Sequence, residues 1–291
     1  MRVMIFGATG LLGKALVREW TEDQVVGFGS KDVDIRDGAQ VRSAVEKRRP
    51  DWIVNAAAYT DVDGCESNRE LAFTVNHRGA VNVADAARSF DARLLFLSTD
   101  YVFDGRSNTP YETDHARAPR TVYGKSKARA EEEIGNIFPD ACIVRTSWLF
   151  GIGGKCFPDT ILRLAASRPE IDVVNDQRGC PTYAPDLARV IVSLCRAGVE
   201  KVIHATNSGD CTWFDFAREI VKCAGLSTVI RPTTSEQFVR LAERPKYSVL
   251  SRRSLNQYGI TMPNWKDALR DYLSARNAFG QAEYAANKPS S

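Results

Sequence analysis

A tyrosine and a lysine four residues apart, Tyr123 and Lys127 in the stretch YGKSK, are residue types that can transfer a proton. At the start of a helix, side chains at positions i and i+4 share one face, so the lysine ammonium can lie beside the phenol. A nearby cation favours the phenolate and lowers the tyrosine pKa from its ordinary value of about 10. Such a phenol can protonate a carbonyl oxygen near neutral pH. By itself such a pair is common by chance and mostly reflects surface packing, so its meaning depends on its surroundings.

A threonine at the end of an apolar run is the second candidate. The run LLFLST predicts a buried strand that ends in Thr99. In a doubly wound sheet, ligands bind outside the carboxyl ends of the strands, so this hydroxyl is expected in the ligand crevice. We therefore predict that Thr99 hydrogen-bonds the reacting oxygen beside Tyr123. A hydroxyl that merely caps a turn or helix is the alternative.

Three glycines near the N-terminus predict a phosphate-binding loop. The stretch GATGLLG places Gly7, Gly10 and Gly13 between the first predicted strand and the first predicted helix. Glycine lets the backbone turn tightly and approach a pyrophosphate, and the helix N-terminus offers free N–H groups. We predict a dinucleotide site here, with a ligand-free glycine turn as the alternative. A bound nicotinamide would bring a further positive charge towards Tyr123.

The residues after the second predicted strand indicate which dinucleotide binds. An aspartate or glutamate there would hydrogen-bond the adenosine ribose and favour NADH. The sequence has Gly29 instead, followed by Ser30 and Lys31 where a 2′-phosphate would lie, which favours NADPH. Asp32 and Asp34 are close enough to leave the register open. A solvated loop residue is the alternative for Lys31.

An alternation of strands and helices must position these residues. Up to about residue 150, apolar runs alternate with helical patterns, including one over 66–90, which indicates βαβ units and a parallel sheet. Several runs are apolar throughout, as in strands that helices cover on both faces. The predicted fold class is α/β: a doubly wound parallel sheet of Rossmann type with a smaller, partly interleaved C-terminal substrate-binding portion.

The predicted organisation has three regions. Residues 1–150 are predicted to form the dinucleotide-binding domain. Residues 151–280 have a looser pattern with proline-containing connections, and we expect them to be mainly substrate-binding, with segments that return to the first domain. Residues 281–291 are expected to be a flexible tail.

Composition excludes several classes of function. The 291 residues carry a net charge of +3 without a basic stripe, so we expect no nucleic-acid partner. No window approaches the roughly 18 apolar residues of a membrane span, so no membrane partner is expected. Seven scattered cysteines and three histidines show no metal-ligand spacing, and no metal is expected. We expect a cytoplasmic protein with reduced, mostly buried cysteines.

Together the motifs resemble those of the extended short-chain dehydrogenase/reductases, most closely the dTDP-4-dehydrorhamnose reductase family. The resemblance runs from MIFGATGLLG through VNAAAYTDVDGCES, LSTDYVFDG, YGKSK and RTSWLFG to NDQRGCPT, almost the whole chain. It implies that NAD(P)H reduces the 4-keto group of a dTDP-deoxysugar. The implied substrate is dTDP-4-dehydro-L-rhamnose, and the product is dTDP-L-rhamnose.

The resemblance also implies roles for the matching residues. Tyr123 is expected to donate the proton, Lys127 to hold the nicotinamide ribose and lower the tyrosine pKa, and Thr99 to tune the pair. Thr99, Asp100 and Trp148 are expected to contact the sugar nucleotide. The other expected cofactor contacts are Gly10, Leu11 and Leu12, then Asp34 and Ile35 near the adenine, then Ala58, Tyr59 and Thr60.

Two positions depart from the family pattern. Gly29 stands where members can carry an aspartate, which argues against strict use of NADH and agrees with the preference for NADPH. Lys14 and Ala15 occupy a region where the family's acidic residues are implicated in a metal-bridged dimer. The sequence therefore supports no metal and leaves monomer or homodimer open.

Several assignments remain open in the second half of the chain. Asp176, Gln177 and Arg178 could line the sugar-nucleotide pocket, and Arg240, Arg244 and Lys246 could contact the diphosphate or form a solvated charge run. Another nucleotide-linked keto sugar is an alternative substrate. A non-catalytic subunit resembling the regulatory β subunit of methionine adenosyltransferase is an alternative function. The intact set of threonine, tyrosine and lysine favours catalysis.

Overall fold

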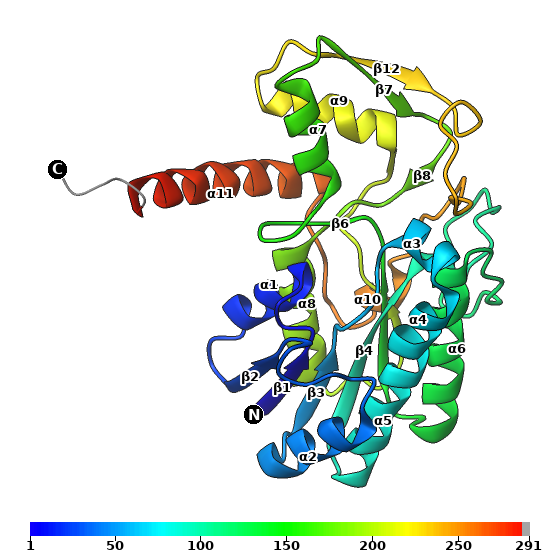
Figure 1. Cartoon of the computed structure of the whole chain (residues 1–291), viewed down its shortest axis with the longest axis vertical. Coiled ribbons are helices and arrows are strands. Elements are labelled where there is room, and N and C mark those ends of the chain that lie inside the picture. The colour runs from blue at the N-terminus through cyan, green and yellow to red at the C-terminus, as the bar shows by residue number, and fades with distance from the viewer. Residues whose placement is uncertain (287–291) are drawn as a thin grey trace.

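Six parallel strands form the central sheet of the protein, in the order β10-β5-β4-β3-β1-β2 (Figure 1). The structure is a computed structural model that describes the backbone of residues 1–286 and the side chains of residues 1–278. The inner strands are buried along almost their whole length, as expected for strands with helices on both faces. The strands are β1 (Arg2–Phe6), β2 (Gln24–Phe28), β3 (Trp52–Asn55), β4 (Arg93–Thr99), β5 (Cys142–Thr146) and β10 (Val202–His204).

Helices cover both faces of this sheet. On one face, α1 and α8 pack together over Val3 and Ile5, and on the other, α2, α5 and α6 pack over Met4 and Phe6. Because successive side chains of a strand point to opposite faces, β1 contributes to both cores. The predicted doubly wound α/β sheet is confirmed. The covering helices are α1 (Leu11–Glu19), α2 (Gly38–Arg48), α5 (Ala80–Ser89), α6 (Val122–Ile137) and α8 (Ala184–Arg196).

The strand order creates a switch point between β1 and β3. From β1 the chain goes to β2 at one edge of the sheet and then returns past β1 to β3. At such a point, loops leave the carboxyl ends of neighbouring strands in opposite directions, and a ligand crevice opens between them. The loop of residues 7–10 follows β1 and the segment 56–61 follows β3, so both border this crevice.

A second, smaller lobe, at the top of Figure 1, is built from the later part of the chain. Phe150, Phe216 and Tyr272 lie in its core. β7 and β12 pair in parallel, and α9 packs against both. The elements of this lobe are β6 (Leu149–Phe150), α7 (Phe157–Ala165), β7 (Glu170–Val174), β8 (Arg178–Gly179), β9 (Thr182–Tyr183), β11 (Cys211–Thr212), α9 (Trp213–Cys223), β12 (Val229–Thr233) and α11 (Trp265–Ala286).

Later segments also return to the first lobe. β10 pairs with β5 at the edge of the central sheet, and α10 (Arg253–Asn256) packs against β10. Helix α8, from the later part of the chain, packs against α1, which lies near the N-terminus. Segments from the later part of the chain therefore lie in both lobes.

The helical pattern predicted over 66–90 is divided into several helices. A π-helical turn, η1, turns the Asn76 side chain inward, where it is buried. Its Oδ1 accepts from the Tyr59 N–H at 2.7 Å, and its Nδ2 donates to the Tyr59 carbonyl at 3.0 Å and to Ser126 Oγ at 3.1 Å. Apolar periodicity gives no signal for this turn because the inward side chain is polar. The helices before α5 are α3 (Val62–Ser67), α4 (Arg69–Phe73) and η1 (Thr74–Gly79).

The end of the chain differs from the expected tail. Helix α11 continues to Ala286, so the tail predicted for 281–291 begins inside this helix, and residues 287–291 lie outside the described residues.

The seven cysteines are free thiols, and all except Cys223 are buried. Among the helices of residues 1–286, none has the length and apolar character that a membrane crossing requires.

Candidate active site

The glycine loop packs backbone against backbone at the switch point. Gly7 has φ +82°, and a Cβ at this position would lie 2.6 Å from the backbone nitrogen of Ala57. A Cβ on Gly13 would lie 2.1 Å from the Gly7 carbonyl oxygen. Glycine is therefore required at both positions for the first turn of α1 to sit close to the segment after β3.

The N-terminus of α1 is free to bind an anion. Gly10 is its exposed N-cap residue and offers no side-chain cap, and the first turn carries no acidic residue. Leu11 is half-buried and Leu12 is buried. The first turn of a helix has backbone N–H groups without partners inside the helix. This cradle fits the pyrophosphate of a dinucleotide.

The segment after β3 forms the opposite wall of the crevice. Asn55 is buried, and its Oδ1 accepts from the Ala57 N–H at 3.1 Å. Ala58 and Tyr59 are half-buried and Thr60 is exposed, so these predicted cofactor contacts border the crevice. Asn76 holds both polar backbone groups of Tyr59, which fixes the path of this wall.

The end of β2 has a built-in reason for glycine. A Cβ on Gly29 would lie 2.7 Å from Thr9 Cγ2, and the Gly29 N–H donates to Asp32 Oδ2 at 2.8 Å. Asp32 is exposed but has one carboxylate oxygen turned back onto the Gly29 backbone, and Ser30 and Lys31 are exposed beside it without such a contact in the described part of the chain. The hydroxyl and the ammonium are the groups that this corner presents to a ligand.

Asp34 and Ile35, expected near the adenine, have different surroundings. The Arg36 guanidinium pairs with the Asp34 carboxylate at 2.5 Å and holds its pKa below the ordinary value. Ile35 is buried and packs against Gly79, where a Cβ would lie 2.8 Å from Ile35 Cδ1. The apolar Ile35 and the ion-paired carboxylate of Asp34 are compatible with an adenine ring nearby.

Tyr123 and Thr99 meet at the carboxyl end of β4. Thr121 caps α6 by accepting from the Gly124 N–H at 3.0 Å, which places Tyr123 in the first turn of the helix. A Cβ on Gly124 would lie 2.2 Å from the Tyr101 carbonyl oxygen, so glycine lets α6 approach the chain after β4. The Thr99 hydroxyl lies close enough to the Tyr123 phenol to oppose the rise in its pKa that burial causes. The structure therefore brings together the hydroxyl groups that the sequence singles out.

Lys127 lies one turn further along α6 and is buried. Its Nζ donates to the Leu97 carbonyl oxygen at 2.6 Å and lies 4.0 Å from the centroid of the Phe96 ring. Burial lowers the pKa of Lys127 to about 7, against the opposing effect of the Glu131 carboxylate. The lysine is thus anchored to β4, beneath the strand end that carries Thr99.

The pKa of Tyr123 differs from the expectation. Burial raises it well above the ordinary value, the Asp100 charge raises it further, and the hydrogen bond with Thr99 acts in the opposite direction. The net effect of the surroundings is thus a raised pKa of Tyr123, because burial dominates, and the contribution expected from Lys127 stays a prediction. The Lys127 amine donates to the Leu97 carbonyl, and burial disfavours its charge. The phenol stays protonated near neutral pH, which is the state of a proton donor.

Asp100 opens a 3₁₀ turn, η2 (Asp100–Val102), directly after β4. Its side chain is buried, and Oδ1 accepts from Thr99 Oγ1 at 2.9 Å. Burial raises its pKa to about 6, opposed by hydrogen bonds from Ser248 and Thr99. Oδ2 has no hydrogen-bond partner in the described part of the chain. This buried acceptor beside Thr99 can bind a hydroxyl group of a ligand.

Trp148 is held in a tryptophan stack. It has φ +47°, and its ring lies parallel to that of Trp213, with centroids 3.5 Å apart and an interplanar angle of 6°. A Cβ on Gly179 would lie 2.6 Å from the same indole. Trp148 is half-buried, so only part of the ring remains for the predicted contact with a sugar nucleotide.

A groove between the two lobes runs past the ring of Tyr101, and several residues that the sequence offered for the sugar-nucleotide pocket line it. Two cavities of about 610 and 350 Å³ share Tyr101, Gln177, Phe238, Arg240 and Arg244 as lining residues. The ring centroids of Tyr101 and Tyr123 are 5.6 Å apart, so this interlobe groove begins beside Tyr123. Phe157, Ile171, Val173 and Trp213 line the smaller, more apolar cavity.

Arg244 stands between the two cavities of the interlobe groove. Its Nη2 donates to Asp63 Oδ2 at 2.8 Å, and Asp63 Oδ1 accepts from the Ala242 N–H at 3.1 Å. Arg244 Nη1 is buried without a hydrogen-bond partner among the described residues. A guanidinium anchored at one side, with free N–H groups at the other, fits an anionic group of a ligand.

Other residues of the second half of the chain that the sequence offered for the sugar-nucleotide pocket already pair with other side chains. Arg178 forms an ion pair with Asp210, and Gln177 Nε2 donates to Ser235 Oγ at 2.8 Å. Arg240 lies 3.7 Å from Asp63. Within residues 1–286, no group of three or more histidine, cysteine, aspartate or glutamate side chains is arranged to hold a metal ion.

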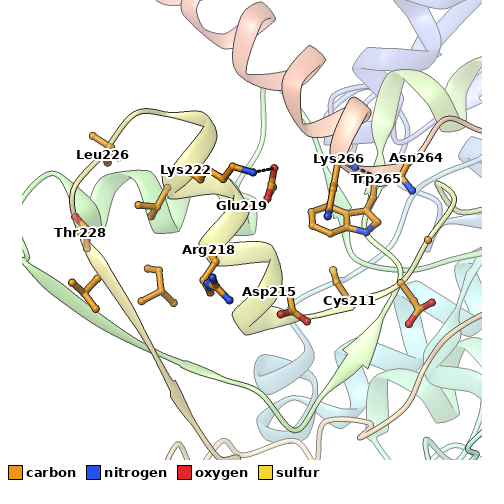
Figure 2. Close-up of a pocket in the computed structure, with 15 residues that line it drawn as sticks. Cys211, Asp215, Arg218, Glu219, Lys222, Leu226, Thr228, Asn264, Trp265 and Lys266 are labelled. Atoms are coloured by element: carbon orange, nitrogen blue, oxygen red, sulfur yellow. Dashed lines mark hydrogen bonds and ion pairs between the residues drawn. The ribbon is translucent and has the colours of Figure 1, made fainter.

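A further cavity of about 850 Å³ lies in the second lobe, between α9, β12 and the start of α11 (Figure 2). Its acidic groups are already engaged: Glu219 accepts from Lys222 Nζ at 3.5 Å, and Asp215 completes the capping box of α9 with Thr212. None of the predicted catalytic residues lines it. It is therefore not part of the candidate active site.

Comparisons with known proteins give this geometry its context. Residues 1–277 match the family model described as the RmlD substrate binding domain. The chain is 41% identical to a dTDP-4-dehydrorhamnose reductase of Streptomyces griseus, over 94% of this chain and 93% of that protein. It is 40% identical to a probable dTDP-4,6-dihydroxy-2-methyloxan-3-one 4-ketoreductase of Streptomyces antibioticus, over 93% and 94%. Among solved structures, dTDP-4-dehydrorhamnose reductase of Bacillus anthracis in complex with NADP has a TM-score of 0.92 and 40% identity, over 94% of this chain and 99% of that one.

Proposed function

The chain belongs to the RmlD substrate binding domain family, and on this premise we propose that it uses NAD(P)H to reduce the 4-keto group of a dTDP-deoxysugar. The proposed substrate is dTDP-4-dehydro-L-rhamnose, and the product is dTDP-L-rhamnose. The name of the Streptomyces griseus relative, at 41% identity, supports this choice. The protein is accordingly an oxidoreductase.

One observation carries the proposal: Thr99, Tyr123 and Lys127 converge at the carboxyl end of β4. The Thr99 hydroxyl lies near the Tyr123 phenol, and the lysine is anchored to the same strand through Leu97. β4 is the neighbour of β3 in the parallel sheet, so its carboxyl end opens on the same edge as the glycine loop after β1. A proton donor beside a dinucleotide cradle is what carbonyl reduction requires.

In the proposed mechanism Tyr123 is the acid. Its buried phenol holds a proton near neutral pH and gives it to the C4 oxygen as that carbon is reduced. Reduced nicotinamide, when bound, supplies the hydride. The phenolate left behind is stabilised by the hydrogen bond with Thr99 and by the positive charge of Lys127. Thr99 also orients the ketone oxygen towards the phenol.

We propose NADPH as the preferred cofactor, with NADH as the alternative. The pyrophosphate would bind the N-terminus of α1 at Gly10 and Leu11, and the exposed Ser30 and Lys31 would hold the 2′-phosphate. The complex of the Bacillus anthracis relative with NADP supports this choice. Asp32, which would compete for a ribose hydroxyl, is turned back onto Gly29.

The interlobe groove is the proposed site of the sugar nucleotide. Asp100 Oδ2 and Thr99 would bind sugar hydroxyl groups, and the exposed part of Trp148 would contact the sugar. The free Nη1 of Arg244 would bind the diphosphate. The apolar cavity beside Phe157 and Trp213 fits a pyrimidine base.

A related keto sugar on the same nucleotide is the second candidate substrate. It is supported by the 40% identity to the Streptomyces antibioticus protein, whose name refers to a different dTDP-linked ketone. Both reactions need the same acid and cofactor, so they differ only in the contacts made to the sugar ring.

We further propose a cytoplasmic monomer or homodimer without a nucleic-acid or membrane partner. The free thiols support a reducing compartment.

The test is direct. The protein is mixed with dTDP-4-dehydro-L-rhamnose made in situ, and oxidation of NADPH and of NADH is followed in parallel by absorbance. Rapid oxidation and formation of dTDP-L-rhamnose are expected. Turnover only with another dTDP-linked ketone would favour the second candidate. Cofactor binding without turnover of any keto sugar would contradict both and favour a regulatory subunit.

A further inference from the structure

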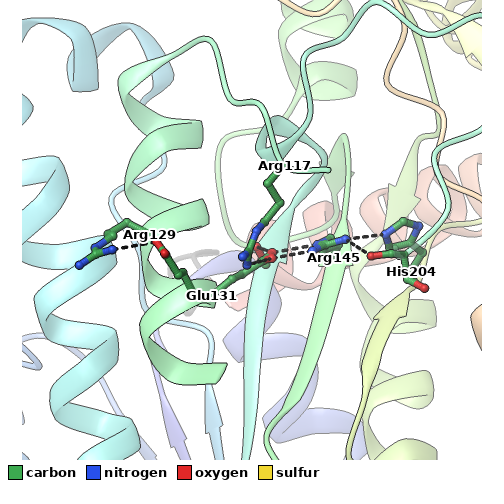
Figure 3. A network of polar contacts seen from close by, with 8 residues as sticks. Arg117, Arg129, Glu131, Arg145 and His204 are labelled. Carbon is green, nitrogen blue, oxygen red and sulfur yellow. Dashed lines mark hydrogen bonds and ion pairs between the residues drawn. The ribbon is translucent and has the colours of Figure 1, made fainter. Parts of the chain in front are cut away.

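A buried ion pair lies behind the candidate active site (Figure 3). Glu131, on α6, and Arg145, on β5, have side chains that are 0% and 4% exposed, and Arg145 Nη2 donates to Glu131 Oε2 at 2.6 Å. Arg145 Nε also donates to Glu131 Oε1 at 2.9 Å. A pair that binds at two points without water restrains the distance between its two elements.

A third element joins the same carboxylate. Ser98 Oγ donates to Glu131 Oε1 at 2.5 Å, and Ser98 is the residue before Thr99 on β4. Ser98 and Arg145 are also register partners in the pairing of β4 with β5. Glu131 therefore connects α6 to two neighbouring strands at the level where β4 presents its catalytic hydroxyl.

The position of Glu131 along α6 continues the catalytic spacing. Tyr123, Lys127 and Glu131 are each four residues apart, so they follow one another along the helix face that packs on β4. Burial of a charged pair is not generally stabilising compared with apolar packing, because both charges lose their hydration. A buried pair at this place therefore calls for an explanation other than stability.

The charge of Glu131 acts on Lys127. Its Nζ lies against β4, where it donates to the Leu97 carbonyl oxygen and lies over the Phe96 ring, and the charge that acts on it comes from Glu131 on the same helix. Arg145 from β5 and Arg117 from the preceding loop reach the other side of the network and contact Glu131 at 2.6 and 3.3 Å. Burial lowers the pKa of Lys127 to about 7, and the Glu131 carboxylate opposes that decrease.

We propose that Glu131, clamped by Arg145 and Ser98, is a positioning residue: it fixes the place of Thr99 relative to Tyr123 and keeps Lys127 charged. This inference rests on the proposed reductase function for its kinetic consequences. Its effect on the charge of Lys127 belongs to the protein itself and is independent of the substrate. A neutral lysine could not stabilise the phenolate that proton transfer leaves on Tyr123.

The test compares Glu131→Gln with Glu132→Gln, a matched change at an exposed neighbour that pairs with Arg129. In protein labelled with ¹³C at the lysine Cε, with Lys127→Met used to assign the signal, Lys127 is titrated by NMR. We expect Glu131→Gln to lower the Lys127 pKa by about one pH unit or more, and Glu132→Gln to leave it unchanged. An unchanged Lys127 pKa in Glu131→Gln would overturn the assignment of its charge to Glu131.

Kinetics gives the second readout. For Glu131→Gln the alkaline limb of kcat/KM is expected to move to lower pH by the same amount, so activity is partly recovered in mild acid. Ser98→Ala leaves the ion pair intact and is expected to lower kcat about ten- to a hundredfold at every pH, with unchanged cofactor affinity and an unmoved limb. Wild-type kcat in Ser98→Ala would overturn the positioning of Thr99.

Two safeguards keep the outcomes distinct. If Glu131→Gln does not fold because Arg145 is left unpaired, the double variant Glu131→Gln/Arg145→Met, which removes both charges, replaces it in the NMR titration. The Lys127 pKa is again expected to decrease. If the wild-type protein reduces no keto sugar, the proposed function fails, while the NMR titration of Lys127 still decides the electrostatic half of the inference.

Discussion

The Cβ position of Gly29 lies 2.7 Å from Cγ2 and 3.0 Å from Oγ1 of Thr9. The Thr9 side chain therefore fills the space that an acidic side chain at position 29 would need in order to hydrogen-bond the adenosine ribose. This contact ties the end of β2 to the loop after β1. It also explains why position 29 is glycine. A change of cofactor preference at position 29 is therefore expected to need a change at Thr9 as well.

Changing Gly29 alone should therefore fail to convert the cofactor preference. Gly29→Asp is expected to weaken binding of both NADPH and NADH, because the new side chain collides with Thr9. Gly29→Asp/Thr9→Gly removes the collision and should shift the ratio of kcat/KM towards NADH by about tenfold, or roughly 1.4 kcal/mol. Steady-state kinetics with both cofactors measures the ratio; Thr9→Gly alone is the control. Equal shifts in Gly29→Asp and in the double variant would contradict the steric argument.

Removal of the Tyr123 hydroxyl should abolish the chemical step and spare binding. Tyr123→Phe is expected to retain NADPH affinity, measured by fluorescence titration, and to lose at least about a hundredfold in kcat because no other acid replaces the phenol. Tyr258→Phe, a change at an exposed tyrosine, serves as the control. Substantial turnover by Tyr123→Phe would mean that another group donates the proton.

The raised pKa of Asp100 predicts a conflict between stability and function. Burial raises this pKa to about 6 in the folded protein, compared with about 3.9 in an unfolded chain. The ionised carboxylate therefore destabilises the folded state, and this penalty is absent below about pH 4 and grows as pH rises through 6. Asp100→Asn should stabilise the protein at pH 7.5 by on the order of 1–3 kcal/mol and lower its activity.

Thermal unfolding of Asp100→Asn and wild-type protein at pH 4 and pH 7.5 checks this prediction. The difference in Tm should be positive at the higher pH and close to zero at the lower one. A variant that is less stable than wild type at both pH values would show that the hydrogen bond between Thr99 and Asp100 outweighs the desolvation of the carboxylate.

Arg244 should contribute to substrate binding but not to cofactor binding. Its Nη1 is free while Asp63 holds its Nη2, so Arg244→Met removes a charge-assisted hydrogen bond from the interlobe groove. KM for the dTDP-sugar is expected to rise about tenfold or more, with unchanged NADPH affinity. Arg231→Met, at an exposed arginine of β12 that pairs with Glu170, is the control. Similar KM values in wild type and Arg244→Met would remove Arg244 from the proposed diphosphate site.

Asp63→Asn should show the same effect in weaker form. The amide can still accept from the Ala242 N–H, but it loses the charge that aligns the guanidinium of Arg244. An intermediate rise in KM for the sugar nucleotide is expected, measured together with Arg244→Met. A double variant no worse than Arg244→Met alone would indicate that Asp63 acts through this arginine.

Much of the fold could be predicted because its signals are local. Apolar runs separated by helical patterns indicate a parallel sheet wherever they occur, and they do so here. The loop at Gly7 is equally readable, since a tight turn with positive φ between a strand and a helix requires glycine. The spacing of Tyr123 and Lys127 places both on one helix face without knowledge of the rest of the chain.

Helical periodicity was a weaker guide where polar side chains turn inward. The single pattern over 66–90 contains a π-helical turn, and Asn76 in that turn binds Tyr59 and Ser126. Glu131 is a similar case: its place among the charges of α6 indicates solvent exposure, yet its side chain is fully buried. Patterns of polarity report burial of apolar residues, but they give no sign of a polar residue that has found a partner inside.

The sequence by itself determined the α/β class, the glycine cradle, the tyrosine–lysine pair and the strand end at Thr99, because each depends on residues within a few positions of one another. Only the tertiary structure decided how the site is completed. Arg244 meets Asp63 across 181 residues, and Trp148 stacks on Trp213 from another element. It also decided that burial, which depends on all surrounding elements at once, raises the pKa of Tyr123. Contacts and desolvation are sums over distant parts of the chain, and local spacing carries no information about them.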